Sequence, residues 1–214
     1  MTEISSAEKN YYSLARFEMT KYIPSNANTI LDVGCGEGSF GVYLKKENKT
    51  VWGVEIHKES AEKAQTCLDK VLIGSIEENL ANLPDGYFDC IIFNDVLEHL
   101  LDPEMVLGII KNKLTPNGVI VSSIPNFRYW KNILKLLYTR DWKYEDSGIL
   151  DRTHFRFFTY LSIKRMFTDL NFEIVTLEGI NGSKSLRFDL FNAFFFFKSG
   201  DARFLQFACV AKKK

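Results

Sequence analysis

The sequence predicts an α/β fold built on a mostly parallel sheet with helices on both faces. Two observations favour this class. The short apolar run 29–33 ends in a glycine-dense turn and passes directly into a helical pattern, which is how a βαβ unit opens. The run 88–93 is apolar without alternation, as expected of a parallel strand buried on both faces. At 214 residues, the chain suits one domain, 1–214, with a sizeable core.

Hydrophobic spacing and turn signals predict the other elements. Tyr11, Leu14 and Phe17 recur at helical spacing, so a helix is expected within the N-terminal segment 1–27. Pro116-Asn117-Gly118 predicts a turn followed by a fifth strand. Further helices are expected at 39–48, 58–68, 103–113, 130–137, 160–169 and within 186–198, and further strands at 49–55, 71–74, 171–177 and 203–212.

Composition excludes several classes of protein. The 27 basic and 27 acidic residues balance, so the chain as a whole has no bias toward nucleic acid or an anionic membrane. No apolar run is long enough to span a bilayer, and the polar start of the chain does not resemble a signal peptide. The four cysteines have neither disulfide nor metal-binding spacing. We therefore expect a cytoplasmic protein without a bound metal.

The glycine turn itself indicates the kind of nucleotide. Residues 36–41 satisfy G-x-G-x-x-G, so an NAD-binding oxidoreductase is one alternative. That motif places a pyrophosphate at the helix N-terminus. Two carboxylates, Asp32 and Glu37, flank this turn and would repel a pyrophosphate. They suit an adenosyl ligand with a cationic end and no phosphate, and S-adenosylmethionine fits that description.

Two phrases of the sequence carry a resemblance to a known family. The segment 31–38, Leu-Asp-Val-Gly-Cys-Gly-Glu-Gly, resembles the first motif of class I S-adenosylmethionine-dependent methyltransferases, and Asp95-Val96-Leu97-Glu98-His99 resembles the phrase that follows their fourth strand. The resemblance implies a Rossmann-like sheet of seven strands with an antiparallel last strand, S-adenosylmethionine as cofactor and S-adenosylhomocysteine as product. It places the cofactor on Asp32, Gly34, Cys35, Gly36, Glu55, Ile56, Ser75, Ile76, Asn94 and Val96.

Individual roles follow for some of these residues. Glu55 lies about 20 residues beyond the glycine turn, where a carboxylate accepts both ribose hydroxyls. Ile56 would present an apolar edge to adenine. The family often carries Asp where this chain has Ser75, so the side-chain contact to adenine changes, and the N–H of Ile76 is left to bind a ring nitrogen. Asn94 would contact the methionine part.

The segment 124–159 is expected to be a substrate lid inserted after the fifth strand. His99, and second to it His154, are the candidate catalytic bases, because imidazole titrates near neutrality. Arg152, His154 and Arg156 alternate with bulky residues, so they would share one face of an extended segment and favour an anionic acceptor. The alternative is that the arginines form ion pairs within the lid.

The sequence thus predicts a methyltransferase acting on a small-molecule or glycan-linked acceptor. Within the lid, the segments 124–130 and 150–159 together resemble a bacterial subgroup found with surface-polysaccharide glycosyltransferases, which implies a role in polysaccharide biosynthesis. A non-catalytic S-adenosylmethionine-binding subunit is the other alternative. No nucleic-acid partner is expected. The run Phe194–Phe197 leaves a homodimer contact open, because four consecutive phenylalanines on a helix cannot all face one way.

Overall fold

The computed structural model describes residues 16–45, 48–196 and 198–214, which form two compact units. The first unit comprises the described residues up to Asn94, together with Glu104–Val121 and Lys213. The second comprises Asp95–Pro103, the described residues of Ser122–Lys212, and Lys214. The predicted contributions of Tyr11 and Leu14 lie outside the described residues. Within the described part of the chain, no helix is long and apolar enough to cross a membrane.

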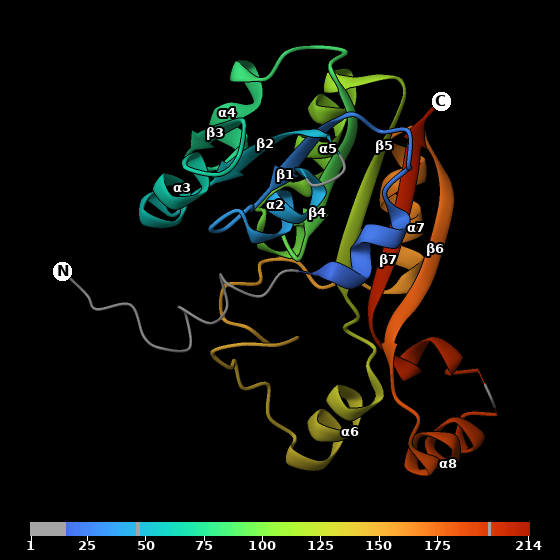
Figure 1. Cartoon of the computed structure of the whole chain (residues 1–214). Coiled ribbons are helices and arrows are strands. Elements are labelled where there is room, and N and C mark those ends of the chain that lie inside the picture. Colours follow the sequence, from blue (N-terminus) through green and yellow to red (C-terminus); the bar gives the residue numbers. More distant parts are fainter. Residues whose placement is uncertain (1–15, 46–47, 197) are drawn as a thin grey trace. The chain divides into compact units, whose positions relative to one another are not determined.

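A seven-stranded sheet with the order β3-β2-β1-β4-β5-β7-β6 confirms the predicted fold class (Figure 1). The sheet is mostly parallel and β7 is its antiparallel strand, as expected. The strands are β1 (Thr29–Val33), β2 (Thr50–Glu55), β3 (Lys70–Ile73), β4 (Phe88–Asn94), β5 (Leu114–Pro125), β6 (Phe172–Gly182) and β7 (Phe204–Lys213). In the first unit, β1 lies between β2 and β4, and all three run parallel. Their carboxyl ends therefore meet at one edge of the sheet.

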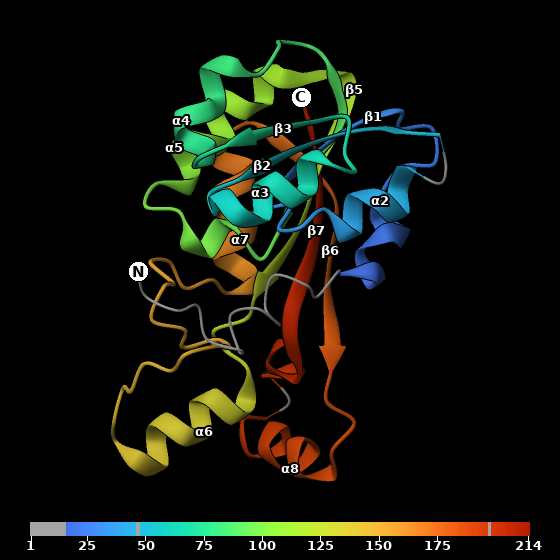
Figure 2. The ribbon, with the colours of Figure 1, turned by 60° about the vertical axis from the view of Figure 1, so that its left-hand side comes forward.

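Helices flank the parallel strands of the first unit. Figure 2 shows α2 and α3 on one face of these strands and α5 on the other. The helices are α2 (Ser39–Lys45), α3 (Lys58–Gln65), α4 (Ile76–Asn79) and α5 (Pro103–Ile110), and a short 3₁₀ turn, η1 (Phe17–Tyr22), lies within the expected N-terminal helix. Small buried residues, Ala61 and Ala64, form the inner face of α3. Covered on both sides, β4 buries residues 90–93 completely, which explains its unbroken apolar run.

The fifth strand differs from the prediction. The structure contains no turn at Pro116-Asn117-Gly118, because β5 already begins at Leu114 and runs through these residues. Gly118 has a different use here. A Cβ at this position would lie 2.8 Å from the carbonyl oxygen of Phe88, so glycine allows the two backbones to approach closely. The residues Pro116-Asn117-Gly118 are typical of a turn, but here the glycine serves a close contact between two strands, so the predicted turn was wrong.

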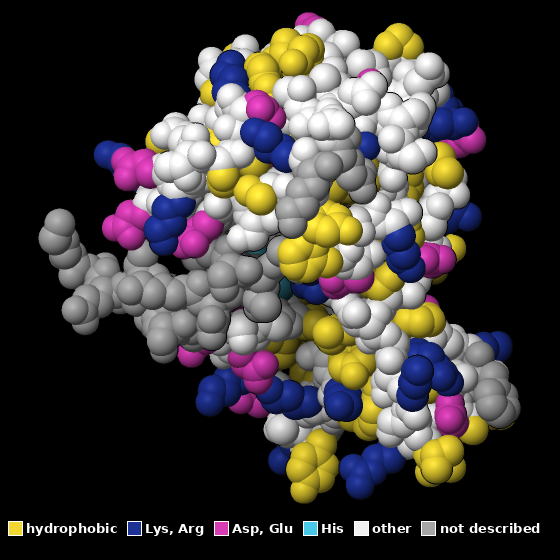
Figure 3. Space-filling view, viewed as in Figure 1, with side chains coloured by type: hydrophobic (Ala, Val, Ile, Leu, Met, Phe, Trp, Pro, Cys, Tyr) yellow, Lys and Arg dark blue, Asp and Glu magenta, His cyan; other side chains and the backbone are white. Residues whose placement is uncertain are grey.

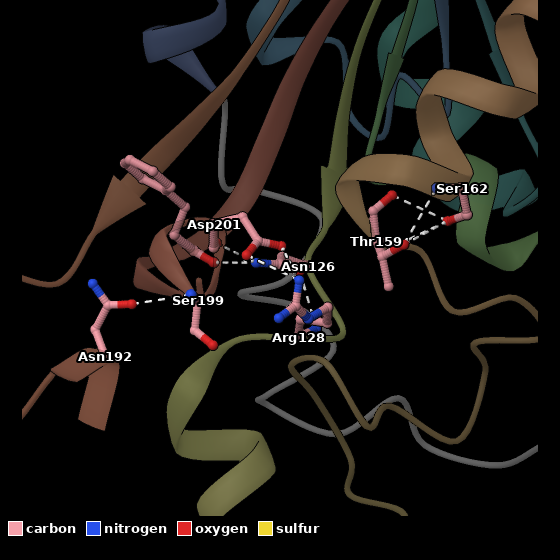
Figure 4. A network of polar contacts seen from close by, with 8 residues as sticks. Asn126, Arg128, Thr159, Ser162, Asn192, Ser199 and Asp201 are labelled. Atoms are coloured by element: carbon pink, nitrogen blue, oxygen red, sulfur yellow. Dashed lines mark hydrogen bonds and ion pairs between the residues drawn. The ribbon is translucent and has the colours of Figure 1, made fainter. Parts of the chain in front are cut away.

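In the second unit, a network of polar contacts holds the segments that follow β5. Its helices are α6 (Trp130–Thr139), α7 (Tyr160–Asp169) and α8 (Leu186–Phe194). The buried amide of Asn126 donates to the carbonyl oxygens of Asp201 and Phe204, at 2.9 Å each, and its oxygen accepts from the amide of Arg128 (Figure 4). Arg128 also forms an ion pair with Asp201 at 2.8 Å. Side chains distant in sequence therefore fix the entry into α6.

Capping and packing fix the other helices of this unit. Thr159 and Ser162 form a capping box at the start of α7, and α7 has the predicted bounds (Figure 4). Trp130 packs with Phe188 and Phe191, which joins α6 to α8.

Several apolar side chains of α6 and α8 remain exposed. Leu137 near the end of α6 is 63% exposed, and Phe194 at the end of α8 is 79% exposed. Figure 3 shows hydrophobic side chains protruding where these two helices lie. Only some of the apolar side chains of these two helices are therefore used for packing within this unit.

Candidate active site

The turn after β1 takes its shape from glycines. Gly34, Gly36 and Gly38 all have positive φ, between 55° and 86°, which residues with a side chain rarely adopt. Three amides of the turn are bonded to backbone carbonyl oxygens. Gly34 and Cys35 donate to the carbonyl oxygen of Val54, and Gly38 donates to that of Cys35. These bonds hold the shape of the turn from within the protein.

Glu55 completes this arrangement from the end of β2. Its side chain is buried, with 2% of the residue exposed, and one carboxylate oxygen accepts from the amide of Gly36 at 2.8 Å. The other oxygen accepts from the amide of His57, also at 2.8 Å. Each oxygen keeps a further lone pair, because a carboxylate offers about four acceptor sites. Glu55 is thus held in a fixed orientation and can still accept two hydroxyl groups.

Two further polar side chains of the first unit lack the partners that burial demands. Asp32, which is 3% exposed, accepts no hydrogen bond from any described residue, and burial together with the neighbouring charge of Glu55 raises its pKa to about 7. The side-chain oxygen of Asn94, at the end of β4, is buried and also has no hydrogen-bond donor among the described residues. Both acceptors belong to neighbouring parallel strands, and both would be satisfied by a ligand carrying N–H donors and a positive charge.

Glu37 contributes less charge to the turn than the sequence suggests. Its carboxylate pairs with Lys63 of α3 at 2.5 Å. The expectation that Asp32 and Glu37 together repel an anion therefore needs correction. The buried carboxylates near the turn are Asp32 and Glu55, and sequence reasoning had no means of detecting the lysine that neutralises Glu37.

The predicted adenine contacts lie at the ends of β2 and β3. Ile56 is exposed directly beyond Glu55. The hydroxyl of Ser75 accepts from the amide of Glu78, and this bond caps α4 in a capping box. The amide of Ile76 is the first of α4, a position that has no acceptor within the helix. The Ser75 hydroxyl therefore accepts a hydrogen bond from the first turn of α4. The amide of Ile76 could still donate to adenine, and this contact stays a prediction.

Two other predicted contacts are less direct. The thiol of Cys35 is buried, and its amide and carbonyl already bond within the protein, so a cofactor contact of this residue stays a prediction. Val96 belongs to the second unit, where it precedes a 3₁₀ turn over Leu97–His99.

The second unit brings both predicted catalytic histidines together. The rings of His99 and His154 pack edge to face, with centroids 4.7 Å apart. The Nδ1 atom of His99 lies 3.2 Å from the carbonyl oxygen of Thr153, and that of His154 lies 3.1 Å from the carbonyl oxygen of Ile149. A carbonyl only accepts, so each Nδ1 carries the proton and the lone pair of each neutral ring is on Nε2. Burial and the nearby His154 lower the pKa of His99, which favours its neutral form.

Glu98 is the residue that sequence reasoning underestimated. The sequence assigned it no role of its own, yet it is 1% exposed, and its Oε1 lies 4.0 Å from Nε2 of His154. Its backbone carbonyl accepts from the amides of both Phe155 and Arg156, which ties the lid segment to the residue beside His99. The signal that could have found it is a carboxylate adjacent to a candidate histidine.

The lid arginines do not share a face with His154. Arg152 is exposed and pairs with Asp146, and Arg156 donates to the carbonyl oxygen of Leu101, whereas His154 is buried. Residues 152 and 153 form a turn and residues 154–157 have no regular secondary structure, so the side-chain alternation of an extended strand does not apply. The expected cationic face for an anionic acceptor is therefore absent from residues 152–156.

Comparisons with known proteins identify the class. A family model described as a methyltransferase domain matches residues 9–177, and the chain belongs to this family. A solved S-adenosylmethionine-dependent methyltransferase from Archaeoglobus fulgidus has the same fold, with a TM-score of 0.71 and 22% identity over 92% of each chain.

Curated relatives give the same class. A ubiquinone biosynthesis O-methyltransferase of Pasteurella multocida is 32% identical over 125 residues, which are 49% of this chain and 51% of that protein. A protein of Mycobacterium tuberculosis described as an uncharacterized methyltransferase is 29% identical over 46% of this chain and 51% of its own length. The chain spans about half the length of these curated relatives.

Proposed function

We propose that this chain transfers the methyl group of S-adenosylmethionine to a small-molecule or glycan-linked acceptor. The observation that carries the proposal is the glycine turn after β1, in which the amide of Gly36 donates to the carboxylate of Glu55. The amides of this turn at residues 34–36 and 38 are bonded within the protein, and the buried acceptors around it, Asp32 and Asn94, call for a cationic ligand. An NAD pyrophosphate at this turn would lie near two buried carboxylates, which would repel it.

The residues of the first unit fit the parts of S-adenosylmethionine. Glu55 would accept the ribose hydroxyls, and Ile56 with the amide of Ile76 would hold adenine. Asp32 and Asn94 would bind the methionine ammonium, with Gly34, Gly36 and Cys35 shaping the turn and Ser75 capping α4. When bound, the cofactor supplies a methyl group on a positively charged sulfur, which is a good leaving group. The task of the protein is then to align the acceptor with that methyl carbon and to exclude water.

The acceptor side of the proposal rests on the second unit. His99 and His154 would activate the acceptor through their Nε2 lone pairs, and Val96 would adjoin the cofactor. The named O-methyltransferases among the relatives favour an oxygen acceptor. The resemblance of the lid to a polysaccharide-associated subgroup favours a glycan-linked one. All four cysteines are free thiols, which supports a reducing, cytoplasmic setting. A homodimer stays a prediction.

Ligand binding tests this function directly. S-adenosylhomocysteine should raise the melting temperature, and NAD should not. Glu55→Gln should abolish most of the shift, whereas Glu59→Gln, at an exposed position on α3, should preserve it. A shift with NAD alone would overturn the proposal. Methyl release from S-adenosylmethionine, screened with nucleotide sugars, glycans and phenols, then identifies the acceptor. Cofactor binding without methyl release to any of these acceptors would favour the non-catalytic subunit.

A further inference from the structure

Three side chains of the second unit form a cluster that the proposed function uses only in part. Glu98, His99 and His154 each offer one ligand atom, and these atoms lie within 4.8 Å of one another. Glu98 and His154 are buried and His99 is half-buried, so the cluster has a single partly exposed member. One carboxylate and two imidazoles are the donors that first-row transition metals prefer.

The backbone prepares both rings for a metal ion. Each Nδ1 is bonded to a carbonyl oxygen, of Thr153 for His99 and of Ile149 for His154, which leaves Nε2 as the ligand atom of the neutral ring. Metal-bound histidines are held by the same kind of outer hydrogen bond.

The backbone also holds the two parts of the cluster together. Glu98 and His99 are consecutive, and His154 comes from the lid segment more than 50 residues later. The carbonyl of Glu98 accepts from the amides of Phe155 and Arg156 at 2.9 and 3.1 Å, directly after His154. The ligand set is therefore fixed by main-chain bonds, as a preorganised metal site requires.

We propose that Glu98, His99 and His154 bind one divalent transition-metal ion, which holds the oxygen of the methyl acceptor. This inference rests on the proposed function, and it replaces the expectation that the protein has no metal. Three protein ligands leave coordination positions open for substrate. Bound there, an acceptor hydroxyl loses its proton to water more readily. Its oxygen then forms the bond to the methyl carbon, and the electrons of the broken carbon–sulfur bond remain on sulfur. The products are the methyl ether, S-adenosylhomocysteine and one proton.

Cobalt binding to the untagged, metal-stripped full chain tests the site. The chain has three histidines, so a tag would add competing ligands. We expect one Co²⁺ per chain, with visible absorption bands that report imidazole coordination. Glu98→Gln and His154→Gln should each weaken binding by at least the roughly 10–100-fold that loss of an outer-shell partner costs. His57→Gln, which removes the third histidine, should leave Co²⁺ affinity unchanged. Far-UV circular dichroism checks that the variants fold.

Several outcomes would overturn the site. These are the absence of Co²⁺ binding, equal affinity in the folded Glu98→Gln and His154→Gln variants, and displacement of Co²⁺ by equimolar Mg²⁺. Methyl transfer by metal-free protein at the rate of the loaded protein would also refute the role of the ion, while leaving the methyltransferase assignment intact. Conversely, Co²⁺ binding without an S-adenosylhomocysteine thermal shift would refute the methyltransferase proposal, and with it the role of the ion toward a methyl acceptor, while leaving the metal site intact.

Discussion

Cofactor binding should release a proton from Asp32. The carboxyl of Asp32 is 3% exposed, and burial with the adjacent Glu55 raises its pKa to about 7. In the free protein at pH 7, about half of the molecules then carry a proton on this group. A bound ammonium group would favour the ionised form, because opposite charges a few ångströms apart lower the pKa of a carboxyl. The complex would therefore hold fewer protons than its separate components.

The size of the effect follows from that pKa. Binding at pH 7 should release about 0.5 proton, rising to about 0.9 at pH 6 and falling to about 0.1 at pH 8. The apparent affinity should consequently increase with pH up to about 7 and then level off, with roughly a tenfold loss per pH unit on the acid side. The same shift of pKa, from 3.8 to about 7, corresponds to roughly 4 kcal/mol between the two protonation states.

Isothermal titration calorimetry measures the release. S-adenosylhomocysteine is titrated into the protein at pH 7 in two buffers with different ionisation enthalpies, and the difference in heat gives the number of protons. In Asp32→Asn, the buffer dependence should disappear even though binding will be weaker. Proton uptake on binding, no buffer dependence in the wild type, or the same dependence in Asp32→Asn would refute the assignment of Asp32 to the cationic end of the ligand.

Three changes test the rest of the structure. Without ligand, stability toward urea should fall as pH rises from about 4 to about 7, because the folded state binds the extra proton of Asp32 in that range, and Asp32→Asn should flatten this part of the profile. Asn126→Ala should lower the free energy of unfolding by about 2–4 kcal/mol, since it removes three buried hydrogen bonds to the backbone; an unchanged denaturation midpoint would contradict the network. Gly118→Ala should cost about 1–3 kcal/mol through the contact with Phe88, whereas Gly200→Ala, with no atom within 4 Å of the new Cβ, should have little effect in the same denaturation assay.

Much of the secondary structure could be predicted from local sequence. Apolar strands, glycine turns and helical spacing report interactions within a few residues, and β4 and α7 are close to their expected bounds for this reason. Glu55 lies at the end of β2 and is bonded to the turn, a position that its distance from the turn in a βαβ unit predicts. Its contact with the ribose stays a prediction. Gly118 shows the limit of this reasoning, since close approach to a neighbouring strand and a turn use the same residue type.

The acceptor cluster could be predicted only in part, because it depends on distant contacts. His99 and His154 were both candidates, but their proximity required Glu98 to bond to residues 155 and 156. The ion pair between Glu37 and Lys63 could not be predicted either, because it joins the turn to a residue of α3 that is distant in sequence, and residue spacing does not show which distant side chains meet. Whether a surface charge is neutralised depends on its ion-pair partner in the folded structure, and the amino-acid sequence alone does not show that partner.

The hydrogen-bond acceptors that hold the glycine turn after β1 belong to another strand, β2. Gly34, Cys35 and Gly36 all donate to residues 54 and 55 of β2, so the loop cannot hold its shape before β1 and β2 have paired. In hydrogen-exchange experiments these three amides should open together with the β1–β2 ladder rather than as a frayed loop. Grafting this nucleotide loop into another scaffold would accordingly require transplanting the second strand with it.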